Sequence, residues 1–258
     1  MAKTRQIVDL SLEIKEAPSV LGASIEYLDH ESSVPAMLAS WPGIRTEDLP
    51  DGLGWASETL TLVSHSGTHM DAPYHYHPTM AGQKSRTIDE MPLEGAFGPG
   101  VVLDMRHVKP GTVITPEDLQ TALEKIRYRL EPLDIVLVMT GADKFWKSND
   151  IRKYITEYPG MGRDATLWLM NKGVKLMGTD AVGWDRAFVV QAEEYRKTGN
   201  NKLIWEGHFA GIEGEYYQME KLTNLDKLPP YGFMVYCFPI KILRASAAWV
   251  RPVAIVEG

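Results

Sequence analysis

Two runs in the middle of the chain, residues 101–105 (VVLDM) and 135–139 (IVLVM), contain almost no polar positions. Apolar runs without alternation are typical of strands that are buried on both faces of a sheet. Residues 174–178 (VKLMG) form a third, more polar candidate. The pattern therefore predicts three buried strands in this half of the chain.

The segment between the first two runs has the spacing of an amphipathic helix. Thr115 has the properties of an N-cap and Pro116 those of the first helical residue, and Glu117 and Asp118 complement the helix dipole. Four apolar residues then recur on one face: Leu119, Leu123, Ile126 and Leu130.

A second helix is expected over residues 164–171, with Gly173 as its left-handed C-cap. The order strand, helix, strand, helix, strand is the rhythm of crossover units with parallel pairing, so the sequence predicts the α/β class. Strand-like patterns also occur near both ends, over residues 6–12, 232–240 and 250–256.

No internal repeat, low-complexity tract or Pro/Gly/Ser-rich linker divides the chain. Its 258 residues, of which 44% are hydrophobic, are enough to bury one large core. We therefore expect a single domain over residues 1–258. Residues 189–204 form a long polar segment that resembles an insertion.

The charge pattern excludes several classes of partner. The chain has 27 basic and 34 acidic residues, a net charge of −7, and no Lys/Arg-rich run, which argues against a nucleic-acid partner. The N-terminus lacks the apolar core of a signal peptide, and no run of about 18 apolar residues occurs, which argues against a membrane partner. We expect a cytoplasmic protein.

Cys237 is the only cysteine, so neither an intrachain disulfide nor a thiolate metal site is expected. It lies in the apolar run FMVYCF, residues 233–238, whereas a catalytic cysteine usually occupies a polar, electropositive niche. Cys237 is therefore predicted to be a core residue.

The strongest chemical signal is the segment SHSGTHMDAPYH, residues 64–75. It holds His65, His69, Asp71 and His75, and His77 follows two residues later. Imidazole nitrogens and a carboxylate oxygen packed this closely are what a catalytic transition metal needs. We predict His65, His69 and Asp71 as ligands, and a structural role for His77.

All five residues have odd numbers, so an extended strand would direct them to one face. The β-rich residues 60–63 before the segment favour a strand running into a turn. Gly67 and Pro73 interrupt a helix, and each is also able to bend a strand. The sequence therefore predicts that the cluster converges without a helix.

The segment from His65 to His75 resembles the His-x-Gly-Thr-His-x-Asp-x-Pro-x-His motif of the cyclase-family metal hydrolases, which include bacterial kynurenine formamidase and isatin hydrolase. The resemblance continues at residues 8–11, 140–141, 178–180 and 219–225, and so covers nearly the whole chain. It implies a compact α/β fold of the swivelling β/β/α type, with a β-barrel-like mixed core flanked by helices, usually dimeric.

The resemblance also implies site residues. His65, His69 and Asp71 would bind one metal, His208 and Glu220 would join Asp71 at a second, and His75 would transfer protons. Formamidases of this family share the carboxylate between two zinc ions, whereas isatin hydrolases hold one manganese, so one or two ions of zinc or manganese are implied. From the residues alone, the neighbouring carboxylates of His208 are equally good candidates: Glu206, Glu213 and Glu215.

The predicted activity is hydrolysis of an amide by metal-activated water, in a formyl-anilide such as N-formylkynurenine or a cyclic amide such as isatin. A lactone hydrolase is the nearest alternative, followed by a non-haem iron oxygenase and a non-catalytic metal-binding protein. The partner is expected to be a small aromatic carbonyl compound, and the assembly a homodimer or larger. Five aromatic residues are candidates either for a pocket wall or for packing: Trp41, Trp55, Tyr74, Tyr76 and Trp146.

Overall fold

The computed structural model describes residues 5–17 and 22–258, and its contacts divide the chain into two units. The first unit comprises residues 1–13 and 67–258, and the second comprises residues 14–66. The organisation as a single domain over residues 1–258 stays a prediction.

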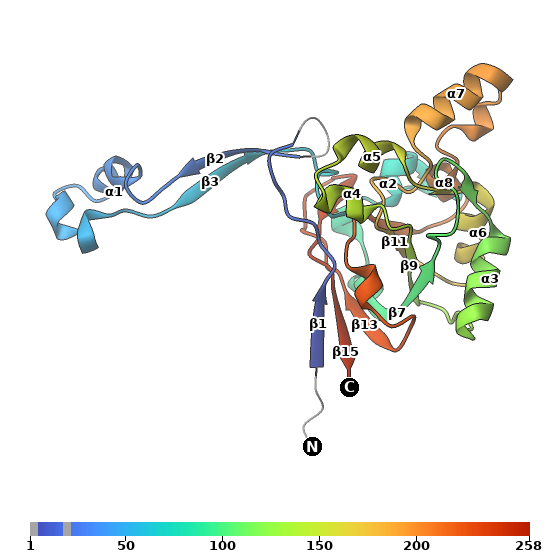
Figure 1. The fold of residues 1–258 in the computed structure, drawn as a ribbon. Coiled ribbons are helices and arrows are strands. Elements are labelled where there is room, and N and C mark those ends of the chain that lie inside the picture. The colour runs from blue at the N-terminus through green and yellow to red at the C-terminus, as the bar shows by residue number, and fades with distance from the viewer. Residues whose placement is uncertain (1–4, 18–21) are drawn as a thin grey trace. The chain divides into compact units, whose positions relative to one another are not determined.

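A nine-stranded mixed sheet forms the centre of the first unit (Figure 1). Its middle strands are parallel, in the order β7 (Phe97–Asp104), β9 (Ile135–Met139), β11 (Leu176–Thr179) and β12 (Tyr217–Glu220). Antiparallel strands continue the sheet beyond β7 as β13 (Phe233–Tyr236), β15 (Val253–Glu257) and β1 (Arg5–Asp9), and beyond β12 as β4 (His69–Asp71) and β14 (Ala247–Trp249). This curled sheet with its helices is a half-barrel, which confirms the predicted α/β class and the β-barrel-like mixed core.

Helix α3 (Pro116–Ile126) connects β7 to β9, and α6 (Arg163–Asn171) lies between β9 and β11, as predicted. The Thr115 hydroxyl accepts a hydrogen bond from the Asp118 backbone N–H, and the Asp118 carboxylate accepts one from the Thr115 N–H, which forms a capping box. The helix ends at Arg127, which has a left-handed φ of 53°. Leu130 is buried but lies beyond the helix, so the predicted helix was one turn too long.

Alternate residues of β7 and β9 pack into two cores on opposite faces of the sheet. The face that packs against α3 and α6 holds Val101, Leu103, Val136 and Val138. The face that packs against strands β4, β12 and β13 holds Val102, Ile135, Leu137 and Met139. Because both faces are covered, these strands have no polar alternation.

The predictions for the chain ends differ from the structure in detail. Residues 250–256 do not form one strand, because Pro252, which has no N–H to donate, separates β14 from β15.

Two further predictions concern single segments of the chain. The polar residues 189–204, predicted as an insertion-like segment, contain most of helix α7 (Phe188–Thr198) and the turn η6 (Asn201–Leu203). Cys237 is 1% exposed and its thiol donates to the Ala96 carbonyl, which confirms it as a core residue.

Short elements complete the first unit. The helices are α2 (Pro73–Tyr76), α4 (Asp143–Lys147), α5 (Ile151–Thr156) and α8 (Glu206–Phe209). The paired strands are β5 (Thr79–Met80) with β6 (Gln83–Lys84) and β8 (Val113–Ile114) with β10 (Gly160–Met161). The 3-10 turns are η4 (Ile88–Glu90), η5 (Leu93–Ala96), η7 (Ala210–Ile212) and η8 (Leu225–Lys227).

The second unit is built around an antiparallel pair, β2 (Ser24–Leu28) and β3 (Ser57–Thr61). Between them lie α1 (Val34–Ser40), η2 (Thr46–Asp48) and η3 (Pro50–Gly52). No residue of α1 is buried, and the rings of Trp41 and Trp55 meet edge to face at 6.0 Å. The second unit therefore has little core of its own.

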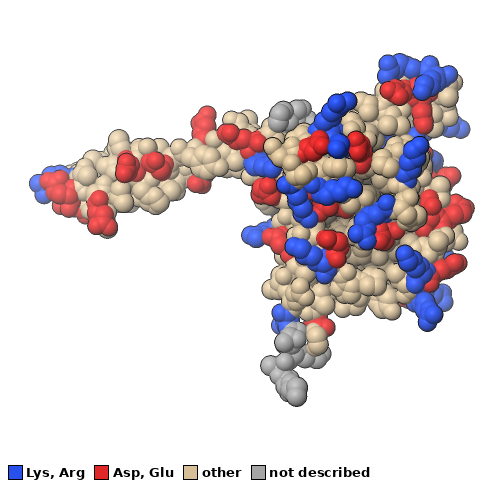
Figure 2. Space-filling view, viewed as in Figure 1, with Lys and Arg blue, Asp and Glu red and all other residues tan. Residues whose placement is uncertain are grey.

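Two findings bear on the predicted partners, one on surface charge and one on the helices. On the face seen in Figure 2, acidic and basic side chains are interspersed over the first unit. Within residues 5–17 and 22–258, none of the helices combines the length and apolar character needed to cross a membrane.

Candidate metal centre

The pairing of β4 with β12 brings four polar side chains to one face of the sheet. His69 lies opposite Glu220, and Asp71 lies opposite Gln218. Met70 and Met219, which alternate with them, point into the core on the other face. All four polar side chains are buried, with Glu220 the most exposed at 6%.

Three of these residues offer a donor set for a divalent cation. His69 Nε2 lies 3.2 Å from Asp71 Oδ1 and 3.7 Å from Glu220 Oε2. Ligand atoms of the three residues all lie within 4.8 Å of one another. Two carboxylates buried side by side require positive charge, and nitrogen and oxygen donors suit zinc and manganese. The residues therefore fit a metal ion.

The orientation of His69 supports the same interpretation. Its Nδ1 lies 3.0 Å from the Gly67 carbonyl oxygen, which only a protonated Nδ1 satisfies. In the neutral ring the lone pair is then on Nε2, which is the atom that faces the two carboxylates. A backbone carbonyl commonly fixes the tautomer of a metal-binding histidine in this way.

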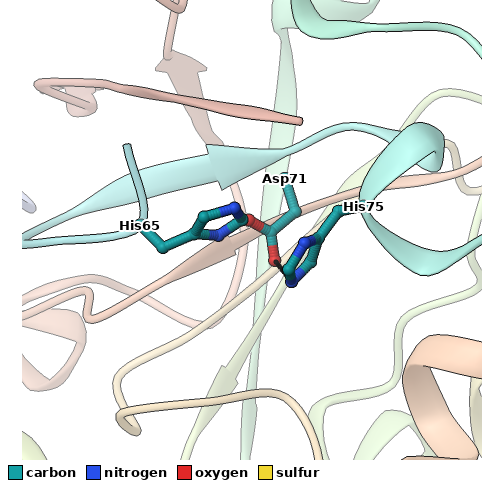
Figure 3. Close-up of side chains that lie close together, drawn as sticks. All are labelled: His65, Asp71 and His75. Carbon is teal, nitrogen blue, oxygen red and sulfur yellow. Dashed lines mark ion pairs between the residues drawn. The ribbon is translucent and has the colours of Figure 1, made fainter. Parts of the chain in front are cut away.

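His75 lies on the one-turn helix α2, so the prediction that the cluster converges without a helix was wrong at this residue. The strand ends at Asp71, and Pro73 begins a helix because its fixed φ suits the first helical position. The His75 side chain still faces the site (Figure 3): its Nε2 lies 3.9 Å from Asp71 Oδ2. It is 23% exposed, unlike the buried Asp71.

His65 precedes the boundary between the two units by two residues. His65 stays a predicted ligand, whereas the donors His69, Asp71 and Glu220 all belong to the first unit. His77 lies in a local turn, where its Nδ1 accepts a hydrogen bond from the Thr79 N–H at 3.1 Å.

His208, on α8, approaches the same carboxylates from the other side. Its Nε2 lies 3.7 Å from Asp71 Oδ2 and 3.4 Å from Glu220 Oε1. Asp185 holds the ring by a short hydrogen bond to Nδ1 and also accepts from the N–H groups of Gly207 and His208. Burial opposes protonation of His208, but the hydrogen bonds with Asp185, Asp71 and Glu220 outweigh it and raise the pKa well above its ordinary value.

Glu220 divides its two oxygens between two sets of neighbours. Oε1 accepts hydrogen bonds from the Trp184 N–H and the Gln218 amide, both at 2.9 Å, while Oε2 faces His69 and lies 3.9 Å from Lys221 Nζ. Burial and the charge of Asp71 raise the pKa of Glu220, but His208 and Lys221 outweigh them and lower it. Glu220 is therefore ionised at neutral pH.

Sequence reasoning missed the groups that orient these ligands: Asp185, Gln218, Lys221 and Trp205. The Trp205 ring stacks on His208 at 4.2 Å and lies 5.0 Å from His75. Gln218 stands two residues before Glu220, so strand periodicity applied to the predicted ligand would have found it. No sequence periodicity points to Asp185, because it belongs to an irregular segment of the chain.

Of the five aromatic residues that were candidates for a pocket wall or for packing, only some lie near the metal centre. The Tyr76 ring lies 5.6 Å from that of His208, whereas Trp146 is buried against Tyr154. Tyr74 is 44% exposed. Trp41 lies directly after α1 and Trp55 two residues before β3, both in the second unit.

Known proteins resemble this chain in sequence and in fold. The family model described as "Putative cyclase" matches residues 8–186. The isatin hydrolase of Roseibium aggregatum is 26% identical over 80% of this chain and 77% of that protein. The kynurenine formamidase of Erythrobacter litoralis is 26% identical over 84% of this chain and 87% of that protein.

Solved structures show the same fold. An isatin hydrolase bound to the product analogue thioisatinate superposes with a TM-score of 0.74 at 22% identity, over 98% of this chain and 93% of that one. Isatin hydrolase A from Ralstonia solanacearum gives a TM-score of 0.75 at 24% identity, over 98% and 92%. The chain belongs to the cyclase family, which confirms the resemblance and the prediction that it is a hydrolase.

Asp71 lies within 4 Å of three imidazoles of the first unit, those of His69, His75 and His208, whereas Glu220 lies within 4 Å of two of them, His69 and His208. We therefore predict that Asp71→Asn lowers metal affinity more than the matched variant Glu220→Gln. Loss of an outer partner of a ligand costs about 10–100-fold in affinity, so loss of the Asp71 charge should cost more than about 100-fold. Titration of the metal-free variants with zinc measures both values. Equal or weaker binding by Glu220→Gln would contradict the central position of Asp71.

Proposed function

We propose that the chain is a metal-dependent amidohydrolase. Its substrate would be a small compound with an amide carbonyl beside an aromatic ring, such as N-formylkynurenine or isatin, and its cofactor zinc or manganese. The observation that carries the proposal is one partly exposed imidazole, His75, beside a buried group of metal donors. A structural metal site closes its coordination with four protein ligands and needs no such neighbour.

Each residue has a task in this reaction. When bound, a divalent ion lowers the pKa of water from 15.7 toward about 7 and polarises the substrate carbonyl. His69, Asp71 and Glu220 would hold the ion, and His65 remains a predicted further ligand. His75 takes a proton from the attacking water at Nε2 and returns it to the leaving nitrogen, which completes the exchange of a C–N bond for a C–O bond.

Aromatic side chains beside His75 support the substrate class. Trp205 and Tyr76 flank the His75 ring, with ring centroids at 5.0 and 6.1 Å. An aromatic substrate would stack on such a wall while its carbonyl points toward the donors. A lactone beside a ring fits the same wall and is the alternative. The cytoplasmic location stays a prediction.

Removal of the metal tests the proposal directly. We expect the purified protein to hydrolyse a formyl-anilide or isatin, to lose this activity on chelation, and to regain it with zinc or manganese. A screen of formamides, cyclic amides and lactones identifies the substrate class. Full activity in protein shown to be metal-free by elemental analysis would refute the proposal, and turnover of lactones alone would favour the alternative.

A pair of histidine variants separates proton transfer from metal binding. His75→Ala should keep a near-normal metal content while kcat falls by about 10²-fold or more, because general acid–base catalysis contributes about that factor. His69→Ala should lower both metal content and kcat. Metal loss in His75→Ala would make His75 a ligand, and an unchanged kcat would leave it a packing residue.

We also propose that the protein is a homodimer or larger. The second unit exposes large apolar side chains, with Tyr27 72%, Trp41 51% and Leu60 46% exposed, and contact with a second copy would cover them. Light scattering at micromolar concentration should report at least twice the chain mass of 28.9 kDa. Leu60→Asp should weaken the assembly, whereas Leu133→Asp, at an exposed leucine of the first unit, should not. A monomeric wild-type protein would refute the proposal.

A further inference from the structure

The side-chain amide of Gln218 lies among the three groups that the family resemblance assigns to a second metal ion. Its Nε2 is 2.8 Å from His208 Nε2, 2.9 Å from Glu220 Oε1 and 3.1 Å from Asp71 Oδ2. All four side chains are buried, and Gln218 is 0% exposed. These separations are hydrogen-bond lengths, so the amide makes contact with every donor atom on this side of the centre.

The surroundings fix which end of the amide points at the donors. At one end of the amide, the buried Tyr216 hydroxyl lies 3.0 Å from Gln218 Oε1 and 3.0 Å from the Gly207 carbonyl oxygen, so its single proton is shared between two acceptors. At the other end of the amide, two carboxylate oxygens attract the NH2 group and would repel a carbonyl oxygen. Gln218 therefore presents its two N–H groups, one to Asp71 Oδ2 and one to Glu220 Oε1, and an amide nitrogen does not bind a cation.

Each of the two carboxylates therefore directs one oxygen toward His69 and the other toward Gln218. Asp71 Oδ1 and Glu220 Oε2 face His69, whereas Asp71 Oδ2 and Glu220 Oε1 face Gln218. We propose that the Gln218 amide takes the place of a second metal ion, so that this chain binds one ion, on the His69 side. The inference deepens the proposed function and rests on it.

Distance and charge both favour one ion. A divalent ion needs donor atoms at about 2.0–2.2 Å, so a second ion among these atoms would require the amide to leave. It would also add a second divalent charge close to the ion on the His69 side, in a region that is removed from water. The neutral amide satisfies the same acceptors without added charge.

Metal stoichiometry tests the inference without any assay of activity. The wild-type protein and Gln218→Ala are stripped of metal, loaded with excess zinc or manganese, desalted and examined by elemental analysis. We expect one ion per chain in the wild type and two in Gln218→Ala, because removal of the amide leaves Asp71, His208 and Glu220 facing one another. Gln120→Ala, at an exposed glutamine of α3, serves as the control and should bind one.

Each outcome decides the question. Two ions in the wild type, or one in a folded Gln218→Ala, would overturn the inference and leave the proposed function standing. No bound ion in the wild type would overturn the proposed function and the inference together. If Gln218→Ala does not fold, Gln218→Asn withdraws the amide by one methylene, and the same rise to two ions is expected.

Discussion

The buried carboxylate of Asp71 is the constraint on which the rest of the centre depends. A charged group that is wholly removed from water must be compensated by opposite charge or by donors. Asp71 receives the Gln218 amide at one oxygen and faces His69 at the other, with His75 and His208 within 4 Å. Compensation of the Asp71 charge therefore links the four segments that carry these residues: β4, α2, α8 and β12.

The pairing of β4 with β12 links this requirement to the hydrophobic core. Alternation places His69 and Asp71 on one face and Met70 on the other, and the same rule separates Gln218 and Glu220 from Met219. A shift of one residue in register would exchange the core methionines for charged groups. Burial of Met70 and Met219 thus fixes the positions of the donors, and the outer partners Asp185, Trp184 and Tyr216 then orient them.

Local pattern predicted the parallel half of the fold well. Residues 101–105 and 135–139 read as buried strands because both their faces are covered, and the Thr115 cap set the start of α3. The prediction failed where a short-range signal was ambiguous. Pro73 was expected to interrupt a helix, but it begins α2. Arg127 ends α3 in a left-handed conformation, for which an arginine side chain has no preference.

The sequence by itself determined the α/β class, the family, and the donor types in residues 65–75, because close spacing along the chain guarantees proximity in space. Only the tertiary structure decided how His208 and Glu220 reach Asp71, since residues 137 or more positions away come together only through the sheet order. It also decided which oxygen of each carboxylate faces His69 and which faces the Gln218 amide. That division depends on strand register and on side-chain packing, for which neighbouring residues in the sequence carry no signal.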